Sequence, residues 1–370
     1  MERGSRLLIV ESMVKRILKK LLSRQLIDQL NGLRGRVDIR LAVTASRFGW
    51  LSALYYSLYS AEFRREMRSV LLARKRYYES RSGHNPSSFI LRRNIHRLEK
   101  GLIMQPRRPV FAEAYIGETI AYLDLCSESD CLSEIESKWA HAVIYEYFSI
   151  VELTDTIAAA HLAYQNIIGH SHVAAFKQPH APLAYSALPP SAIGFDDLKA
   201  LCERRHSVRW FEEKAVPREM LDAAIDVAAT APSACNRQPF QFYIFDDPSR
   251  AQEIGSIPMG TAGFSQNFQS VIVVVGDLSA YPFEKDRHII YIDSGLAVMQ
   301  LQLALECQGL GSCAINWPDI DRHERRMAKE LALEPYQRPV MLLAVGYPKK
   351  DALVPYSAKK TAVDLVVRPR

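Results

Sequence analysis

The chain has 370 residues, of which 48% are hydrophobic and 24% are charged, and its formal net charge is +6. This length favours two domains, and the composition excludes an intrinsically disordered protein. The six cysteines include no CxxC pair, so neither a zinc site nor a disulfide framework is expected, and a reducing cytoplasm fits best. No apolar run reaches the roughly 18 residues of a membrane span, and Glu11, Lys15 and Arg16 argue against a secretory leader.

Basic charge is concentrated near the N-terminus. Residues 1–80 hold 17 Lys or Arg against 7 Asp or Glu, a net of +10, which leaves −4 for residues 81–370. Helical spacing of apolar residues predicts basic amphipathic helices over 7–30 and 60–79. This end is interpreted either as a peripheral contact with an anionic membrane at its inner face or as the solvated surface of a helical domain. Nucleic acid is not an expected partner, because no DNA- or RNA-binding module is recognisable.

A second basic cluster lies within residues 85–109. Gly101 is expected to end its helix, since Pro106 and Pro109 prevent continuation. The cluster is interpreted either as an anion site for a phosphate or carboxylate or as ion pairs to acidic helices containing Glu113, Glu118 and Asp124. Its members, most of them on one helix face, are Arg92, Arg93, His96, Arg97 and Lys100.

Three segments make up the predicted domain organisation. Residues 1–168 form a basic, mostly helical domain, with helix expected throughout 111–168, and residues 195–370 form a second domain. Between them, 169–194 is rich in proline and lacks periodicity, which predicts a linker. Its histidines, 170, 172 and 180, have no acidic or thiol partner at ligand spacing, so no metal site is expected.

The C-terminal domain mixes helices and strands without a regular βαβ alternation, which favours an α+β fold over a doubly wound sheet. It contains neither GxGxxG nor GxxxxGK[ST], so a glycine-rich nucleotide loop is not expected. Helices are expected at Phe195–Arg205, from Pro217 onward and at Tyr291–Gln308. Strands are expected at Phe240–Phe245, Val271–Val275, Val340–Val345 and, as a last short one, Leu365–Val367.

Two polar segments carry the candidate chemistry. The first, from Arg205 to Phe211, contains arginines and a serine that can hold a phosphate through charge-assisted hydrogen bonds. The second, from Ala231 to Phe240, contains Asn236 and Gln238, whose amides suit the edge of a heteroaromatic ring such as a flavin. Taken alone, either segment favours an ordinary capped turn with surface arginines.

Together, about 25 residues apart, the two segments resemble the R-[RH]-S-x-[RK]-x-F and A-P-S-x-x-N-x-Q-P-[WF] motifs of the nitroreductase family. The resemblance covers about 175 residues and implies an α+β fold with a mixed sheet flanked by helices. It continues through Asp293 to Gly295 at the start of a long helix, the G-L-G-S turn ending at Ser312, the V-G-Y-P stretch at 345–348, and the basic pair Lys359 and Lys360.

The resemblance implies that the chain binds FMN, with its two motifs supplied by different subunits of a homodimer. The backbone N–H groups of 314–316, which include Ile315 and Asn316, are expected near the reactive N5 atom of the flavin. No catalytic side chain is expected, because this chemistry requires no protein nucleophile or base. The residues implied for the phosphate and ribityl chain are Arg205, His206, Ser207 and Arg209 with Lys359 or Lys360. Those implied for the ring are Pro232, Ser233, Ala234, Asn236 and Gln238.

The expected activity is that of an FMN-dependent oxidoreductase that takes electrons from NADH or NADPH and passes them to an unidentified small molecule. The LRRNIHRLEKGL stretch resembles extended members found in bacterial polysaccharide-biosynthesis gene sets, which implies a role there. The alternatives are a non-catalytic flavin-binding or scaffold protein of a polysaccharide assembly, a substrate-oxidising flavin dehydrogenase, and a flavin-consuming or dehalogenating relative. Phe264 and Trp317 are interpreted either as lining the substrate slot or as core residues.

Overall fold

A computed structural model of the chain describes residues 24–169 and 180–369. The chain forms two compact units, Met1–Met67 and Arg68–Arg370, and each is described by itself. The first 17 residues of the helix expected over 7–30, together with His170 and His172, lie outside the described residues. The predicted domain boundaries, at 168/169 and 194/195, stay a prediction.

In its described residues the first unit contains two complete α-helices and a short π-helical turn. They are α2 (Arg24–Ala45), α3 (Gly49–Leu54) and η1 (Tyr55–Tyr59). The hydroxyl of Tyr55 donates to Asp38 Oδ1 at 2.7 Å, which ties η1 to α2. Many of the apolar side chains of this unit are exposed, among them Trp50 and Leu58.

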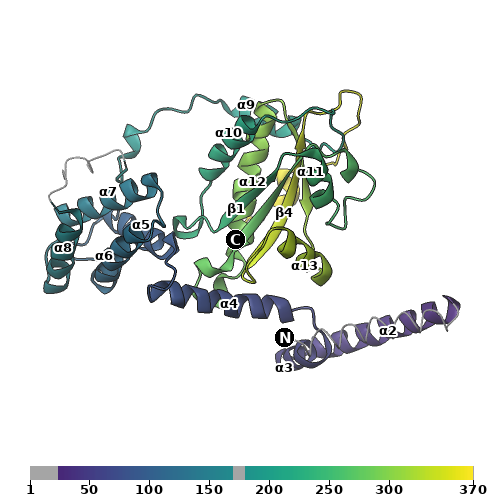
Figure 1. The fold of residues 1–370 in the computed structure, drawn as a ribbon, viewed down its shortest axis with the longest axis horizontal. Helices are drawn as coiled ribbons and strands as arrows, with labels where there is room; N and C mark the ends of the chain where they lie inside the picture. The colour runs from purple at the N-terminus through teal and green to yellow at the C-terminus, as the bar shows by residue number, and fades with distance from the viewer. Residues whose placement is uncertain (1–23, 170–179, 370) are drawn as a thin grey trace. The chain divides into compact units, whose positions relative to one another are not determined.

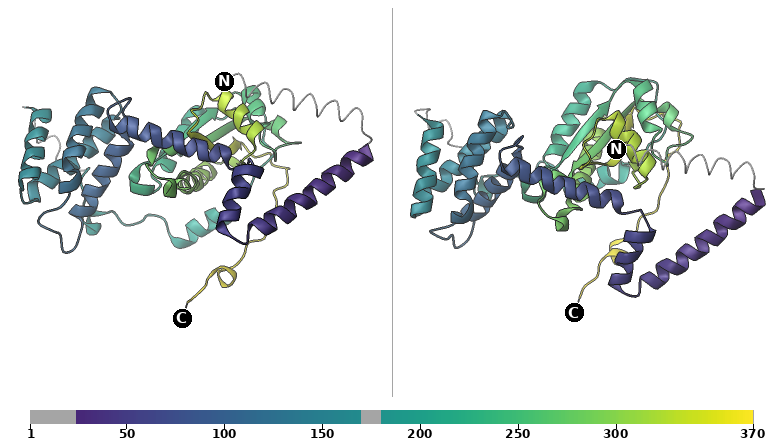
Figure 2. Two further views of the ribbon diagram at one scale, coloured as in Figure 1. Left: turned by 90° about the horizontal axis from the view of Figure 1, so that it is seen from below. Right: turned by 60° about the horizontal axis from the view of Figure 1, so that its bottom comes forward.

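A bundle of helices follows, and it confirms that residues 111–168 are mostly helical. Its core is made by fully buried side chains such as Ile95, Leu123, Ile144 and Tyr147. Gly101 lies inside the last turn of its helix, where an added Cβ would lie 2.3 Å from the ring of Phe111. The helices are α4 (Arg64–Arg81), α5 (Ser88–Leu102), α6 (Glu113–Glu128), α7 (Glu134–Ile150) and α8 (Asp155–Ile168). Figure 2 shows α4 running from α5–α8 alongside the domain that contains the sheet.

The C-terminal part is built on one four-stranded sheet, so the α+β prediction is confirmed. The strands lie in the order β1-β2-β4-β3, and each neighbouring pair is antiparallel. In the described residues the parallel component of the expected mixed sheet is one isolated bridge, between Ser207 and Ser312. The strands are β1 (Phe240–Phe245), β2 (Ser270–Asp277), β3 (Gly311–Asn316) and β4 (Gln337–Gly346).

Two elements differ from the prediction. β3 occupies residues that were expected to be a turn and a loop. The strand expected at Leu365–Val367 is wrong, because α14 (Ala362–Leu365) occupies its start. Thr361 and Asp364 cap this helix reciprocally, and such a capping box stabilises a helix start rather than a strand.

Helices cover both faces of the sheet (Figure 1). On β2, Val271, Val273 and Val275 face one core and Ile272 and Val274 face the other, as the alternation of a strand requires. α11 (Pro248–Gly255) and α13 (Asp321–Glu330) cover the first core, and α10 (Arg218–Ala229) and α12 (Ile289–Cys307) cover the second. α9 (Phe195–Arg204) precedes these elements.

α12 is long and apolar enough to meet the length and composition of a membrane span, as part of the window Glu284–Cys307. Leu301 and Leu305 of this helix are fully buried against the sheet and α10. It therefore serves as the central core helix of this domain.

The bundle and the sheet domain share a small apolar core. Val70 and Ala73 of α4 pack against Leu278, Ala280 and Tyr281, which follow β2. Arg74 forms an ion pair with Glu284 close by. Since these contacts bury side chains from both sides, α4 is part of the folded domain rather than an appendage to it.

Candidate functional site

The arginine-rich segment is seated against the sheet by two glycines. An added Cβ on Gly311 would lie 2.8 Å from Val208, and one on Gly346 would lie 2.8 Å from Phe211. Real Cβ atoms essentially never approach so closely, so both positions require glycine. The backbone N–H of Val208 donates to Ser312 O at 3.0 Å and fixes the segment beside β3.

A cleft of about 610 Å³ opens beside this segment. It brings together Arg205, His206 and Ser207 with Lys359, which lies more than 150 residues later in the chain. Lys199 of α9 also lines it, and one turn later on the same helix it pairs with Glu203, the single acidic lining residue, at 3.8 Å. The predicted phosphate-binding residues therefore meet in one place with an excess of positive charge. The second lysine of the pair, Lys360, is exposed but does not line this cleft.

Arg209 points elsewhere, into a smaller cavity of about 210 Å³ that Cys313, Ile315 and Asn316 of β3 also line. Its guanidinium carbon lies 5.9 Å from the ring centre of Phe264. Phe264 thus lines a cavity, as one interpretation of it predicted. β3 is the last strand in the sheet order, so beyond the bridge to Ser312 the edge of its backbone that faces away from β4 is available to a ligand.

Trp317 belongs to the core rather than to this cavity. It is 8% exposed and its indole N–H donates to Glu324 Oε1 at 2.7 Å. The ion pair between Glu324 and the buried Arg338 completes this network. The core interpretation of Trp317 therefore applies.

The turn before β1 is tightly wound. Cys235, Asn236 and Gln238 adopt φ values of 53°, 50° and 48°, a left-handed conformation that residues other than glycine rarely adopt. The backbone N–H of Asn236 donates to Ser233 O at 2.9 Å, and that of Gln238 donates to Ser233 Oγ at 3.0 Å. Backbone of this kind persists only where surrounding contacts determine it, and it is concentrated at functional sites.

The two amides of this turn differ in what they contact. Gln238 donates from Nε2 to Ala229 O at 2.7 Å and accepts at Oε1, so both ends of its amide are held by protein. The side-chain amide of Asn236 has no hydrogen-bond partner among the described residues. Asn236 is therefore the amide that remains available to a ligand.

The carboxylate of Asp293 holds the start of the turn. Asp293, in the second turn of α12, accepts the backbone N–H of Ala234 at 3.0 Å and the hydroxyl of Tyr281 at 3.2 Å. Burial raises the pKa of the Asp293 carboxyl, and the hydrogen bond from Ala234 acts in the opposite direction. This contact links the start of the long central helix to the candidate ligand-binding turn.

The two predicted halves of the site lie at opposite edges of the sheet. The turn leads into β1 at one edge, whereas the arginine-rich segment bridges to β3 at the other edge. Three strand spacings of about 4.8 Å separate these edges. Within one chain, the ring-binding and phosphate-binding residues are therefore not brought together.

The basic cluster of α5 reaches the turn. Arg92 contacts both Asn236 and Gln238 and pairs with Glu136, an acidic partner that the sequence did not indicate. Arg93 pairs with Glu118 at 3.1 Å, which confirms the ion-pair interpretation for that residue. Arg97 lies over the ring of Tyr115 instead of pairing with an acid.

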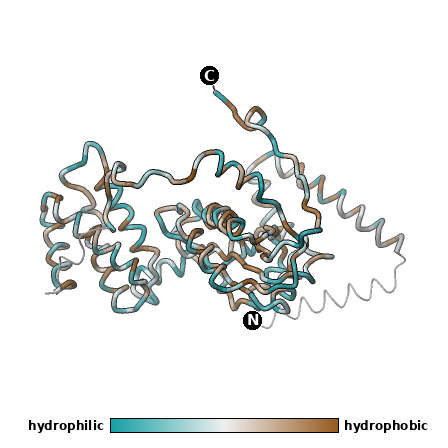
Figure 3. The backbone as a smooth tube through the Cα atoms, turned by 90° about the horizontal axis from the view of Figure 1, so that it is seen from above, coloured by the Kyte–Doolittle hydropathy of each residue, from teal (hydrophilic) through white to brown (hydrophobic). Residues whose placement is uncertain are grey.

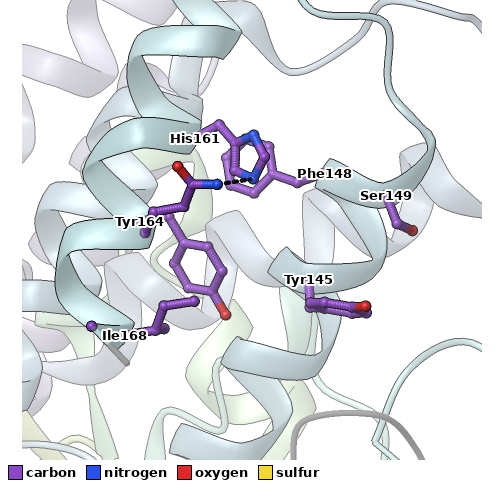
Figure 4. Close-up of a pocket in the computed structure, with 8 residues that line it drawn as sticks. Tyr145, Phe148, Ser149, His161, Tyr164 and Ile168 are labelled. Atoms are coloured by element: carbon purple, nitrogen blue, oxygen red, sulfur yellow. Dashed lines mark hydrogen bonds between the residues drawn. The ribbon is translucent and has the colours of Figure 1, made fainter. Parts of the chain in front are cut away.

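A separate hollow of about 480 Å³ lies in the bundle, between α7 and α8 (Figure 4). The ring of His161 stacks on that of Phe148 with 4.5 Å between centres, and Tyr164 lies beside them. Tyr164 also contacts the buried His141 through its hydroxyl at 3.1 Å. No predicted site residue lines this hollow, which places it apart from the candidate cofactor site.

Known proteins match the C-terminal half. The sequence pattern of the Nitroreductase family matches residues 202–262 and 258–347. A protein of Archaeoglobus fulgidus named as NADH dehydrogenase/NAD(P)H nitroreductase is 30% identical over 159 residues, which cover 42% of this chain and 86% of that protein. An iodotyrosine deiodinase of Thermotoga neapolitana is 30% identical over 167 residues, 40% of this chain and 87% of the deiodinase. Among solved structures, an FMN-dependent nitroreductase of Clostridium difficile aligns with a TM-score of 0.40 and 20% identity, over 46% of this chain and 98% of that one.

Proposed function

The chain belongs to the nitroreductase family of oxidoreductases, and from that premise we propose that it binds FMN and transfers electrons from NADH or NADPH to a small-molecule acceptor. Members of this family are FMN-dependent and use NAD(P)H. The observation that carries the proposal is the cleft that gathers Arg205, Ser207 and Lys359 from distant parts of the sequence.

These residues suit the charged tail of FMN. A phosphate near pH 7 prefers several cationic donors and a hydroxyl, and arginine can offer two parallel N–H groups to it. The side chain of Arg205 forms no hydrogen bond with any described residue, so its guanidinium is available. When bound, FMN supplies the two-electron chemistry of this family. The chain's role is to hold the phosphate, orient the ring with Asn236 and the edge of β3, and exclude water.

A homodimer is part of this proposal, because one chain alone keeps the two halves of the site apart. Its supporting observation is an apolar stripe on α12 in which Ile292, Leu296 and Met299 are all more than 40% exposed. The C-terminal segment is also exposed in places, with Leu353 at 93% and Val363 at 90%. Figure 3 shows hydrophobic stretches along the part of the chain that leads to the C-terminus. The proposal requires that a two-fold contact through these surfaces bring the turn of one subunit beside the cleft of the other.

The first experiment is reconstitution with FMN, followed by anaerobic mixing with NADH or NADPH. The proposal expects a yellow protein with one FMN per chain whose flavin absorbance bleaches when the nicotinamide is added. A protein that holds FMN but is not reduced by either nicotinamide supports the scaffold or dehydrogenase alternatives. A colourless protein that takes up no added FMN contradicts the proposal itself.

The acceptor can be narrowed by comparing substrate classes. Relatives at 30% identity include a protein named for NAD(P)H nitroreductase activity and a deiodinase. Turnover of nitroaromatic compounds, iodotyrosine and quinones by the reduced protein therefore separates three classes of acceptor. The role in polysaccharide biosynthesis rests on the resemblance of the LRRNIHRLEKGL stretch, and reduction or oxidation of a nucleotide sugar in the same assay would support it.

We also propose that the first unit docks on an anionic membrane from the cytoplasmic side. Exposed Trp50, Leu54 and Leu58 suit insertion at a lipid interface, and exposed Arg36 and Arg47 suit anionic headgroups. The full-length protein should sediment with phosphatidylserine vesicles and not with phosphatidylcholine vesicles. The Trp50→Ala variant should bind less, whereas the control Tyr185→Ala, which removes an exposed aromatic outside the first unit, should not. Equal sedimentation of all three proteins with both vesicles would contradict membrane docking.

A further inference from the structure

We propose that Arg92, from the helical bundle, is the positioning residue of the turn that contacts the flavin. The bundle would then be a working component of the cofactor site rather than an added module. This inference deepens the proposed function and depends on it, because the turn has a cofactor to orient only if the protein binds FMN.

The contacts of Arg92 come from two parts of the chain. Its Nε donates to Asn236 O at 2.6 Å, and its Nη2 donates to Gln238 Oε1 at 2.6 Å. Its Nη1 donates to Glu136 Oε1 at 2.7 Å. The first two bonds span 144 and 146 residues of sequence, so they join α5 directly to the turn.

The surroundings of Arg92 fix the direction of its side chain. The residue is only 8% exposed, and its guanidinium carbon lies 5.5 Å from the ring centre of Trp139. Trp139 is itself held by a hydrogen bond from its indole N–H to Glu99 Oε1 at 2.9 Å. Glu136 is fixed as well, because it closes the capping box of α7 with Ser133. A buried arginine with this many partners has one orientation, and so do the groups that it contacts.

The neighbouring charge indicates that Arg92 orients the turn rather than binding an anion. Glu136 neutralises the guanidinium, and the three nitrogen atoms of Arg92 all donate to protein acceptors. Arg205, in contrast, lines an open cleft and forms no hydrogen bond with a described side chain. The two arginines therefore serve different purposes, and only Arg205 suits a phosphate.

The turn requires such support because its backbone is unusual. Asn236 and Gln238, both contacted by Arg92, have positive φ values, which residues other than glycine keep only where surrounding contacts hold them. Asp293 holds Ala234 from the side of the sheet domain, and Arg92 holds the later residues from the side of the bundle. Apolar packing joins them, since Phe89 of α5 and Ala234 contact the same small core. The backbone that carries the free amide of Asn236 is thereby held in place.

The test compares two neighbouring arginines of α5 in the full chain. Arg92→Lys keeps the charge that pairs with Glu136, but an ammonium on a flexible stem cannot make three bonds in the geometry of a planar fork. Arg93→Lys is the matched control, because Arg93 contacts Tyr77, Asn94 and Glu118 within the bundle and does not contact the turn. The measurements are the FMN dissociation constant, the midpoint potential of the bound flavin and its visible circular dichroism.

Arg92→Lys should weaken FMN binding about tenfold or more and shift both the potential and the dichroism of the bound flavin. Arg93→Lys should leave all three measurements unchanged. Arg92→Ala should weaken FMN binding more than Arg92→Lys does. If Arg92→Ala does not fold, the Arg92→Met, Glu136→Gln double variant takes its place, because it leaves no unpaired buried charge.

The outcomes distinguish this inference from the proposed function. If the unmodified protein binds no FMN, the proposed function fails. If it binds FMN, and the Arg92 variants keep its affinity, potential and dichroism, the inference about Arg92 is overturned while the proposed function remains. If Arg93→Lys changes the flavin spectra as much as Arg92→Lys does, the effect belongs to the bundle as a whole, and the specific role of Arg92 is also overturned.

Discussion

The turn of residues 231–239 and the cleft around Arg205 are built in opposite ways. The turn is wound tightly, is contacted by Asp293 and Arg92 from two sides, and leaves one side-chain amide without a partner in the described part of the chain. The cleft is open, and several of its cationic side chains have no acidic partner among the described residues. Preorganisation reduces the entropy lost on binding, so the turn should set the orientation of a flavin, whereas the cleft should supply most of the binding energy for its phosphate.

The largest expected effect concerns the cleft. Arg205→Ala removes a charge-assisted donor from the phosphate, and FMN affinity should fall about a hundredfold, or about 2.7 kcal/mol. Fluorescence titration of the apoprotein with FMN measures this change. Arg204→Ala is the control, because Arg204 pairs with Glu306 and does not line the cleft. Equal losses in the two variants would mean that general surface charge, rather than the cleft, attracts the cofactor.

The second largest effect is expected where the arginine-rich segment packs against the sheet, at the contact between Phe211 and Gly346. Gly346→Ala places a methyl group against Phe211, and the free energy of unfolding should fall by about 2 kcal/mol. Gly117→Ala is a control within α6, where an added Cβ meets nothing within 4 Å and should be stabilising. Urea denaturation monitored by circular dichroism compares the two. A Gly346→Ala protein as stable as the parent would show that the segment can move away from the sheet.

The two amides of the turn provide a sharper comparison. Asn236→Gly should weaken FMN binding by about 1 kcal/mol and leave stability nearly unchanged, because that amide contacts no described residue and glycine readily adopts the φ of 50° found here. Gln238→Ala should lower stability by about 1 kcal/mol, because it leaves Ala229 O and Arg92 without their partner. Parallel FMN titrations and thermal melts of the apoproteins measure both. The reverse assignment of the two effects would contradict the contact pattern of the turn.

The smallest expected effect is a pH dependence of the turn's support. Burial raises the folded-state pKa of Asp293 above its ordinary value of 3.8. A carboxyl with a raised pKa contributes stability that is full below the ordinary value and is lost as pH rises through the raised one. Asp293→Asn does not titrate, so its stability relative to the parent should increase from about pH 4 to pH 7. Denaturant melts across this range check the sign, and a decreasing difference would mean that the charged carboxylate is stabilised in the fold.

Runs and stripes of apolar residues were enough to predict the main core elements of the sheet domain. β2 and β4 are runs of β-branched and apolar residues, and α10 and α12 carry apolar stripes, so each was expected close to its observed bounds. β3, in contrast, reads GSCAIN, which has neither alternation nor bulk. It is a strand only because β4 pairs with it, and that context lies outside the local sequence.

Only some of the contacts at the candidate site could be predicted from the sequence. The family motifs predicted that Arg205, Ser207 and Lys359 belong to one site, and all three line the same cleft. The contact of Arg92 with the turn could not be predicted, because Arg92 and Asn236 are 144 residues apart in the sequence and no local pattern indicates a contact over that separation. The capping pair Thr361 and Asp364 could have been recognised from its spacing, and it would have corrected the expected final strand.

The small core beneath α4 has a practical consequence for anyone who shortens this chain. The recognisable family sequence begins at residue 202, yet Leu278, Ala280 and Tyr281 are covered by side chains from residues 70 and 73. A fragment that begins at residue 202 would expose this apolar surface to water and would lack Arg92, which contacts the turn. Such a fragment should precipitate or self-associate, and any poor flavin retention in it would reflect the missing cover rather than the chemistry of the intact enzyme.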